Sequence, residues 1–320
     1  MNGQRVLVTG GCGFIGANLV PNLLAAGARV VILDNLTRGF RDHVDTAQVE
    51  LIEGDIRDPE AVQRAMQGVD TVIHLAAYGS VMESVTDPNA NFDINARGTL
   101  TVLEGARDAG VERFVFASTG GAIMGDTPPP VNENSVPRPL SPYGASKLCG
   151  EAYCHAFAGS YGLNTVMLRF GNVYGPWSAH KKGAVTVFIK ALLTGEPIRI
   201  YGDGSASRDL LHVEDLCDGI LRAAASDLPA PTTLHLASGA ETSVAGLANL
   251  LKKIAGRPDH PVEYLDGRAG EVSRNFADAS AAERLLGFRA ARDFEAGMRH
   301  TWDWFLARRE TVLATQTSDS

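Results

Sequence analysis

The feature that most constrains this chain is a glycine-rich turn behind a short apolar run. Residues 9–16 read TGGCGFIG, in which Gly10, Gly13 and Gly16 follow the pattern G-x-x-G-x-x-G, and the β-branched run 5–8 precedes them. Glycines permit a tight turn, and the free N–H groups of a following helix attract phosphate. The turn predicts a strand–turn–helix unit that binds the diphosphate of a dinucleotide. A tight turn without a ligand would carry the same glycines.

Apolar runs alternate with amphipathic stretches through the first half of the chain. Continuous apolar runs, typical of strands buried on both faces, occupy 30–33, 71–75, 114–117 and 166–169, and helical spacing marks 17–26, 60–67, 95–109 and 141–161. This alternation predicts an α/β fold with a Rossmann-like doubly wound parallel sheet. We expect an NAD-binding domain at 1–170, to which later elements return, a smaller α/β substrate-binding region at 171–310, and a disordered tail at 311–320.

An acidic residue at the end of the second predicted strand supports the dinucleotide hypothesis. Asp34 follows Gly16 by 18 residues, the position from which a carboxylate accepts hydrogen bonds from the adenosine ribose and disfavours the extra phosphate of NADP. NAD is therefore the expected cofactor, with Arg38 nearby to moderate that preference. Asp55 closes the run 49–54 and is either a further cofactor contact or a surface acid in a turn.

Composition excludes several classes of protein. The chain has 320 residues, 45% of them hydrophobic, and 29 basic against 37 acidic side chains give a net charge of −8. This balance argues against a general nucleic-acid binder. The four cysteines show neither CxxC nor zinc-site spacing, which predicts reduced thiols, no metal and a cytoplasmic protein. We see no signal peptide, and no apolar run is long enough for a membrane span.

The segment YGASK places Tyr143 and Lys147 four residues apart, on one face of a predicted helix. A phenol has a pKa of about 10, and lowering it to near 7 takes roughly 4 kcal/mol. A neighbouring ammonium and a positively charged nicotinamide both stabilise a phenolate. The pair predicts a tyrosine base supported by a lysine. Taken alone, Y-x-x-x-K is also an ordinary helix-surface pair.

Further segments extend the pattern along the chain: Asp34-Asn35, His74-Leu75-Ala76-Ala77, Asn95 with Gly98-Thr99, LRFGNVYGP and IRIYGDGSASRDLLHVEDL. Together with the glycine turn and YGASK they resemble the extended short-chain dehydrogenase/reductase family. Within that family they are most similar to the nucleotide-sugar 4-epimerases of the UDP-glucose 4-epimerase type. The resemblance runs from Val6 to about Phe288.

The resemblance implies a set of functional positions. The catalytic trio would be Thr119, Tyr143 and Lys147. Cofactor contacts would come from Gly10, Gly13, Phe14, Ile15, Gly16, Asp34, Asn35, Thr37, Arg38, Gly39, Asp55, Ile56, Leu75, Ala76, Ala77, Asn95, Ser118, Tyr143, Lys147 and Gly171. Substrate contacts would come from Ser80, Thr119, Tyr143, Asn172, Ala184, Val185, Arg199, Tyr201, Arg208 and Arg268. Local alternatives remain for Ser118 and Thr119 (turn formation), Ser80 (loop capping) and Arg199 (a solvated edge charge).

The implied reaction is C4 epimerisation of a UDP-sugar through a transient 4-keto intermediate, with NAD held as a prosthetic group. Related dehydratases carry Asp-Glu where this chain has Gly120-Gly121, which favours an epimerase. Asn275 stands where members restricted to glucose and galactose often carry Tyr, which indicates room for a larger substituent. The expected order of substrates is UDP-glucose/UDP-galactose, then UDP-N-acetylhexosamine, then UDP-glucuronate.

Two other hypotheses remain open. One is a related NAD(P)-dependent nucleotide-sugar reductase, dehydrogenase or dehydratase, and the other is a non-catalytic NAD-binding scaffold. The family also implies a homodimer that pairs helices 95–109 and 141–161 of two subunits. His74 is interpreted as a packed structural residue, and the loop His180-Lys181-Lys182 either closes over a ligand or is solvated.

Overall fold

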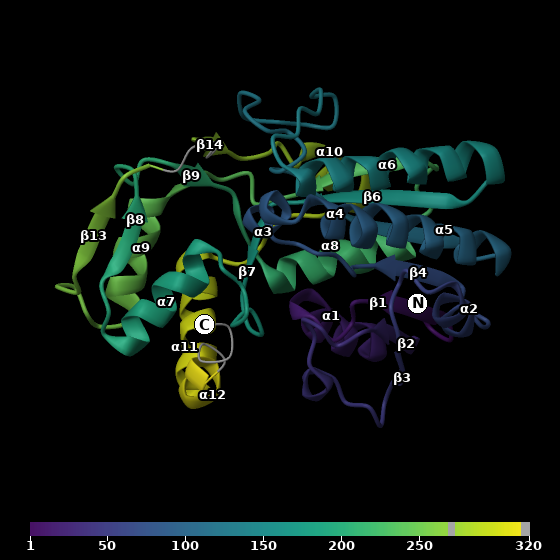
Figure 1. The fold of residues 1–320 in the computed structure, drawn as a ribbon, viewed down its shortest axis with the longest axis horizontal. Helices are drawn as coiled ribbons and strands as arrows, with labels where there is room; N and C mark the ends of the chain where they lie inside the picture. The colour runs from purple at the N-terminus through teal and green to yellow at the C-terminus, as the bar shows by residue number, and fades with distance from the viewer. Residues whose placement is uncertain (268–272, 315–320) are drawn as a thin grey trace.

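A wholly parallel seven-stranded sheet forms the centre of the molecule in the computed structural model, which describes residues 1–267 and 273–314 (Figure 1). In sheet order its strands are β11 (Thr232–Leu236), β6 (Asn164–Phe170), β5 (Arg113–Thr119), β4 (Thr71–His74), β1 (Arg5–Thr9), β2 (Arg29–Asp34) and β3 (Glu50–Glu53). The predicted doubly wound α/β fold is confirmed.

Alternate residues of the central strands enter two separate cores, one on each face of the sheet. Val6 and Val8 of β1 pack with helices α1 (Phe14–Ala25), α8 (Val213–Ala225) and α10 (Ser280–Leu286), whereas Leu7 packs with α2 (Pro59–Ala65), α5 (Gly98–Asp108) and α6 (Pro142–Tyr161). Burial on both faces explains why these strands are continuous apolar runs in the sequence.

The order of the strands fixes where a ligand binds. The chain runs outward from β1 through β2 to β3 and then returns to the other side of β1 as β4. In open parallel sheets the crevice beyond the carboxyl ends of the strands at such a reversal is the usual ligand site. Thr9, Asp34, His74 and Thr119 all stand at those carboxyl ends.

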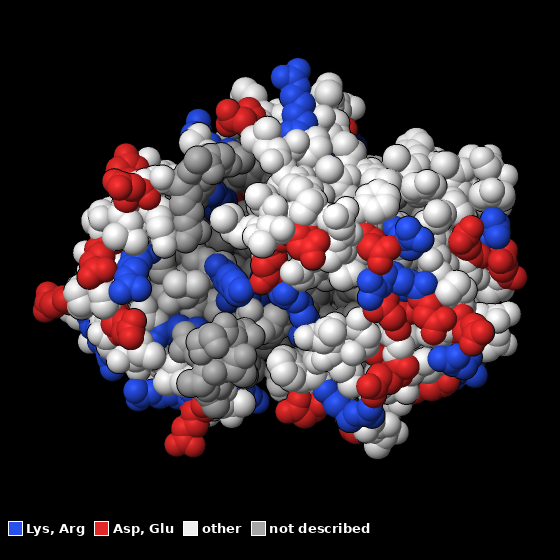
Figure 2. All heavy atoms as spheres, in the orientation of Figure 1, with Lys and Arg blue, Asp and Glu red and all other residues white. Residues whose placement is uncertain are grey.

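The second half of the chain builds a third core beside the sheet. Helices α7 (Ala184–Thr194), α9 (Val244–Ile254) and α11 (Phe294–Ala307) pack with β8 (Ile198–Tyr201), which pairs with β13 (Val262–Leu265). Short strands lie between the halves: β7 (Asn172–Tyr174) with β10 (Leu210–His212), and β9 (Ser207–Arg208) with β12 (Thr242–Ser243) and β14 (Arg274–Asn275). The face in Figure 2 is hollowed between the halves, and blue Lys and Arg side chains gather there.

Three short elements join β4 to α5: helix α3 (Val81–Thr86), helix α4 (Pro88–Phe92) and a π-helical turn, Asp93–Arg97. A 3-10 turn, Arg41–His43, follows β2. No helix in the described ranges has both the length and the apolar character needed to cross a membrane.

The predicted disordered tail at 311–320 is wrong over its first residues. Helix α12 (Arg309–Ala314) continues beyond α11, and Val312 is buried in the third core. The apolar pair Val312-Leu313 within an otherwise polar stretch accounts for this ordered turn. Residues 315–320 lie outside the described part of the chain.

Candidate active site

The glycine turn is built for a diphosphate. Gly10 has φ +69°, and a Cβ there would lie 2.8 Å from the Ala76 backbone; a Cβ on Gly16 would overlap the Gly11 carbonyl oxygen. Helix α1 starts after Gly13 with no side-chain cap and no acidic residue in its first turn. Its first amides are therefore left for an anion, where the helix dipole also favours negative charge.

Asp34 is buried directly beside this turn. Its Oδ2 accepts from the Cys12 N–H (3.0 Å) and its Oδ1 from the Leu36 N–H (2.9 Å), which fixes the carboxylate at the end of β2. Burial raises the pKa of Asp34 above its ordinary value. Arg38 is placed differently from the sequence hypothesis, because its guanidinium pairs with Glu83 of α3 at 2.6 Å.

The other predicted residues of this loop bond to one another. Asn35 donates to Asp55 (3.0 Å) and accepts from the Thr37 hydroxyl. Arg57 donates to Asp55 as well, which lowers the pKa of that carboxyl to about 2. The segment therefore forms a structured rim beyond β2 and β3, behind Asp34.

His74 is a packed structural residue, as the sequence predicted. Its ring lies between the Thr9 hydroxyl (2.7 Å) and the Thr99 hydroxyl (2.9 Å), with no exposed surface, and burial lowers its pKa to about 3. The same Thr9 oxygen accepts from the Ala76 N–H at 3.2 Å. This contact fixes the backbone that follows β4, at Leu75, Ala76 and Ala77.

Helix α6 brings Lys147 and Tyr143 to the end of β5. The Lys147 ammonium donates to the Ala117 carbonyl (2.9 Å) and lies 4.9 Å from the Phe116 ring centre; burial lowers its pKa to about 8. Tyr143 stands one turn earlier, and desolvation raises the pKa of its phenol to about 12. Thr119, the last residue of β5, is partly exposed beside them.

The direction of the Tyr143 shift differs from the sequence expectation. The sequence predicts that an ammonium and a positively charged nicotinamide together stabilise the phenolate, whereas burial acts alone on the pKa of the phenol here and raises it. The protein's own groups therefore keep the phenol protonated. The fall in pKa that base catalysis requires has to come with the charge of bound ligands.

A buried polar network holds the start of α6 in place. Ser146 donates to Asn91 (2.9 Å) and accepts from Asn95 of the π-helical turn (3.0 Å), while the Tyr143 N–H donates to the Ser84 hydroxyl (3.1 Å). Asn95 also bonds the backbone of Tyr78 in both directions. A satisfied network of this kind fixes the position of the helix that carries the reactive side chains.

A second buried network lies behind the catalytic strand. The Ser118 hydroxyl donates to Glu151 of α6 (2.6 Å), and Glu151 also accepts two bonds from Arg169 of β6 (3.0 and 2.8 Å). Ser118 is 3% exposed. Its hydroxyl thus anchors β5 to α6, immediately next to Thr119.

Predicted substrate residues and the predicted cofactor residue Gly171 line the junction of the two halves. The side chain of Asn172 is exposed at the start of β7, the Gly171 N–H donates to Leu236, and Arg208 donates to the Ser207 carbonyl. The Asn275 amide lies about 3.1 Å from the position of a Cβ on Gly121. The residue singled out for substituent size thus borders the turn behind Thr119.

Other predicted substrate residues have local roles. Arg199 pairs with Glu263 (3.2 Å) with more than half of its side chain exposed, and Ser80 caps α3 by accepting from the Glu83 N–H. Ala184 is exposed and Val185 buried at the start of α7, and Tyr201 is 37% exposed on β8. Arg268 lies outside the described residues.

Three residues next to the cofactor-side loops were not singled out by the sequence, namely Tyr78, Glu83 and Trp177, whereas Lys181 belongs to the loop 180–182 whose closure over a ligand the sequence left open. Tyr78 stacks under Arg38 (4.8 Å), Glu83 pairs with Arg38, and Trp177 and Lys181 reach across from the second half. Their partners are distant in the sequence, so no local pattern reveals them. The one available signal is the rare Trp beside the charged run at 180–182.

The doubly wound sheet and the glycine turn at the carboxyl end of its first strand define a dinucleotide-dependent enzyme. The comparisons agree: the chain belongs to the NAD dependent epimerase/dehydratase family, whose model matches residues 6–237. The chain uses NAD, as that family does.

Similar proteins extend over nearly the whole chain. The UDP-glucose 4-epimerase of Mycolicibacterium smegmatis is 37% identical over 94% of this chain and 98% of its own length. Among solved structures, the UDP-glucose 4-epimerase of Thermotoga maritima with UDP-glucose has a TM-score of 0.91 and 36% identity, over 97% of this chain and all of that one. The UDP-glucose 4-epimerase of Thermus thermophilus in complex with NAD has a TM-score of 0.89 and 38% identity, over 95% of this chain and 99% of that one.

Proposed function

We propose that this protein is an NAD-dependent nucleotide-sugar 4-epimerase, an isomerase acting first on UDP-glucose/UDP-galactose. The observation that carries the proposal is the placement of Tyr143 and Lys147 at the end of β5, with the Lys147 ammonium on the Ala117 carbonyl and Thr119 two residues further on. Relatives of this length and similarity named UDP-glucose 4-epimerase support it.

The side chains divide the work on the sugar. When bound, NAD supplies the acceptor and donor of the C4 hydride. Tyr143 takes the proton of the 4-hydroxyl and returns it, Thr119 hydrogen-bonds the same oxygen, and the charge of the bound nicotinamide acts together with Lys147 to stabilise the phenolate. Asn172, Arg208 and Arg268 would anchor the nucleotide diphosphate while the 4-keto sugar turns. Arginine suits that task because its planar fork binds two phosphate oxygens at once.

In this proposal, Asn275 determines how large a substituent on the sugar the site accepts. A short amide packed against Gly121 leaves more room than a tyrosine at the same place. UDP-N-acetylhexosamine is therefore the second candidate and UDP-glucuronate the third. A dehydratase is disfavoured because Gly120 and Gly121 follow Thr119, where elimination of water needs an acid.

The direct test uses purified protein without added cofactor, incubated separately with UDP-glucose, UDP-N-acetylglucosamine and UDP-glucuronate. Proton NMR of the anomeric signals follows formation of the 4-epimer. We expect an equilibrium mixture with UDP-glucose. The Tyr143→Phe variant should lose about 10²- to 10⁴-fold in kcat with unchanged thermal unfolding; full turnover in that variant would refute the assignment of the base.

We also propose a cytoplasmic homodimer. All four cysteines are free thiols, which supports the cytoplasmic location. Cell fractionation tests that location.

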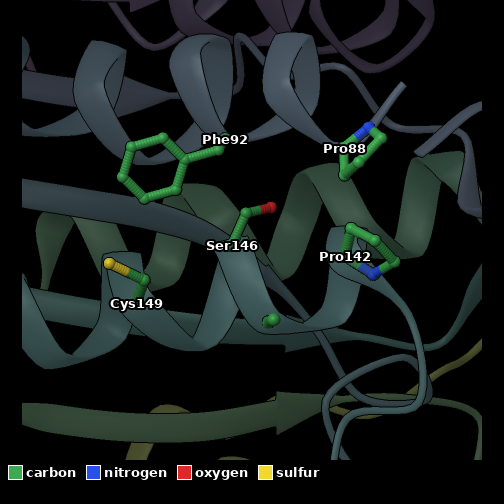
Figure 3. A pocket seen from close by; sticks show the side chains of 6 residues that line it. Pro88, Phe92, Pro142, Ser146 and Cys149 are labelled. Carbon is green, nitrogen blue, oxygen red and sulfur yellow. The ribbon is translucent and has the colours of Figure 1, made fainter. Parts of the chain in front are cut away.

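The proposed dimer can be tested at Phe92, which is 57% exposed on α4, above a pocket against α6 that Pro88, Pro142, Ser146 and Cys149 also line (Figure 3). Light scattering should give the mass of a dimer, and Phe92→Asp should shift the measured mass toward that of the monomer. Monomeric wild-type protein would contradict the proposed dimer.

A further inference from the structure

One segment of the second half reaches over the cofactor-side loops of the first. Residues 175–183, called the strap here, connect β7 to α7. The Asn18 side chain of α1 donates to the Pro176 carbonyl at 3.1 Å. Within the strap, the Ser178 hydroxyl donates to the Gly175 carbonyl (2.7 Å). The strap is therefore an ordered turn docked on the helix whose first amides face the diphosphate site.

Aromatic side chains fasten the strap to the loop that follows Asp34. The Trp177 ring lies 4.6 Å from that of His43, whose Nδ1 contacts the Cys12 carbonyl of the glycine turn at 3.0 Å. His180 and Phe40 approach to 6.5 Å. His43 is part of the loop that follows Asp34, and it also contacts the glycine turn. Both parts of the predicted dinucleotide site are therefore connected to the strap through His43.

Trp177 is itself held from the other side. Trp304 of α11 lies 5.3 Å from it, and the Arg308 guanidinium lies over both indoles at 5.3 and 4.8 Å. Trp177 has φ +67°, a backbone conformation that side chains with a Cβ adopt only when their surroundings enforce it. The contacts of the indole with His43, Trp304 and Arg308 account for that conformation.

Ion pairs form a second connection between the strap and the loop that follows Asp34. Glu83 of α3 accepts from Arg38 of the Asp34 loop (2.6 Å) and from Lys182 of the strap (2.8 Å). The strap and the loop are therefore joined by an ion-pair bridge as well as by tilted aromatic contacts.

Lys181 is the cation of the strap that faces the cofactor side. Its ammonium lies 5.4 Å from the ring centre of Phe14, the first residue of α1. It has no carboxylate partner within the described residues, and the residue is exposed to solvent. A positive charge beside uncapped helix amides complements a diphosphate.

We propose that the strap retains NAD in the enzyme between turnovers, with Lys181 contacting the cofactor diphosphate and Trp177 holding the strap against the Asp34 loop. This inference rests on the cofactor site proposed above and adds to it the element that closes the exit. NAD leaves only after the aromatic contacts and the Glu83 bridge have separated.

The test measures NAD itself rather than turnover. Holoenzyme is mixed with an excess of isotopically labelled NAD, and the bound cofactor is sampled over time by mass spectrometry after denaturation. Loss of a charge-assisted contact should make exchange about 10- to 100-fold faster in Lys181→Met, and Lys181→Arg should restore slow exchange. Lys253→Met is the matched control: it removes a solvent-exposed pair with Glu295, outside the strap, and should change exchange at most about fivefold.

A second pair of variants tests the fastening. Trp177→Ala should also release NAD faster, whereas Trp177→Phe keeps an aromatic ring in contact with His43 and should stay near the wild type. Thermal unfolding of each cofactor-free variant separates faster release from a damaged fold. Wild-type rates in both Lys181→Met and Trp177→Ala would overturn the strap while leaving the epimerase proposal intact. Wild-type protein that neither contains nor takes up NAD would overturn the proposed function itself.

Discussion

The buried ion pair behind the catalytic strand gives a sharp test of how this site is supported. Glu151 and Arg169 have side chains only 8% and 7% exposed, joined by two hydrogen bonds, and Ser118 donates to the same carboxylate. Changing Glu151→Gln keeps the shape and an acceptor for Ser118 but leaves the guanidinium without a counter-charge. Arg169 Nη1 has no hydrogen-bond partner even in the wild type, so the buried guanidinium is already incompletely hydrogen-bonded before the substitution.

Removing one partner of a buried pair costs about 3–5 kcal/mol, because the remaining charge stays desolvated. At roughly 2.1 cal/mol/K per residue, the 320 residues give an unfolding entropy near 0.7 kcal/mol/K, so Tm should fall by about 4–7 °C. Calorimetry on the Glu151→Gln variant measures this directly.

The matched control makes the same chemical change in an exposed pair. Asp218 and Arg222 on α8 lie 2.6 Å apart with about half of each side chain exposed, so Asp218→Asn should cost less than about 1 kcal/mol. Adding Arg169→Met to Glu151→Gln removes the uncompensated charge and should recover most of the lost stability. Equal losses in Glu151→Gln and Asp218→Asn would refute the argument.

Three further predictions follow from the site. In cofactor-free protein, the free energy of unfolding should rise by about 3 kcal/mol between pH 8 and 10.5. The reason is that folding lowers the pKa of Lys147 from 10.5 to about 8, so that the folded state loses the desolvated charge at a lower pH than the unfolded state does. Denaturant titrations of Lys147→Met should lack this rise, and the variant should be inactive. Gly16→Ala should lower Tm and NAD content because its Cβ meets the Gly11 carbonyl. Gly159→Ala, which has open space around its Cβ in α6, should instead stabilise the protein by about 0.5–1 kcal/mol. Equal effects of the two substitutions on Tm would contradict this prediction. Asp34→Asn should raise the affinity for NADP relative to NAD at least about tenfold in competition binding, because it removes the charge that repels a ribose phosphate.

The sequence predicted the sheet well because its strands are buried on both faces. Val30 to Leu33 and Phe114 to Ala117 are continuous apolar runs in the sequence and central strands in the fold. The short strands β9, β12 and β14 have two residues each, too few for any periodicity. Their pairing depends on contacts between distant segments, which local patterns do not contain.

The site was predictable where one motif carries its chemistry. Tyr143 and Lys147 are one helical turn apart, so spacing alone places them together. The pKa of Tyr143 was not predictable, because it depends on desolvation by surrounding elements. Arg38 was expected near Asp34, yet a carboxylate 45 residues away in sequence, Glu83, takes its guanidinium.

The return of the chain to the sheet has a consequence for dissecting this protein. After β7, α7 and β8 have supplied their part of the second half's core and before α9 and α11 complete it, the chain pairs β11 with β6 through five residues, from Thr232 opposite Val166 to Leu236 opposite Phe170. A fragment that ends after β6 would leave that strand as an open apolar edge, the kind of surface on which chains add to one another and aggregate. Cutting the polypeptide at the apparent boundary near residue 170 is therefore expected to yield inclusion bodies rather than an isolated cofactor-binding unit, whereas a fragment extended through Leu236 keeps its edge strand.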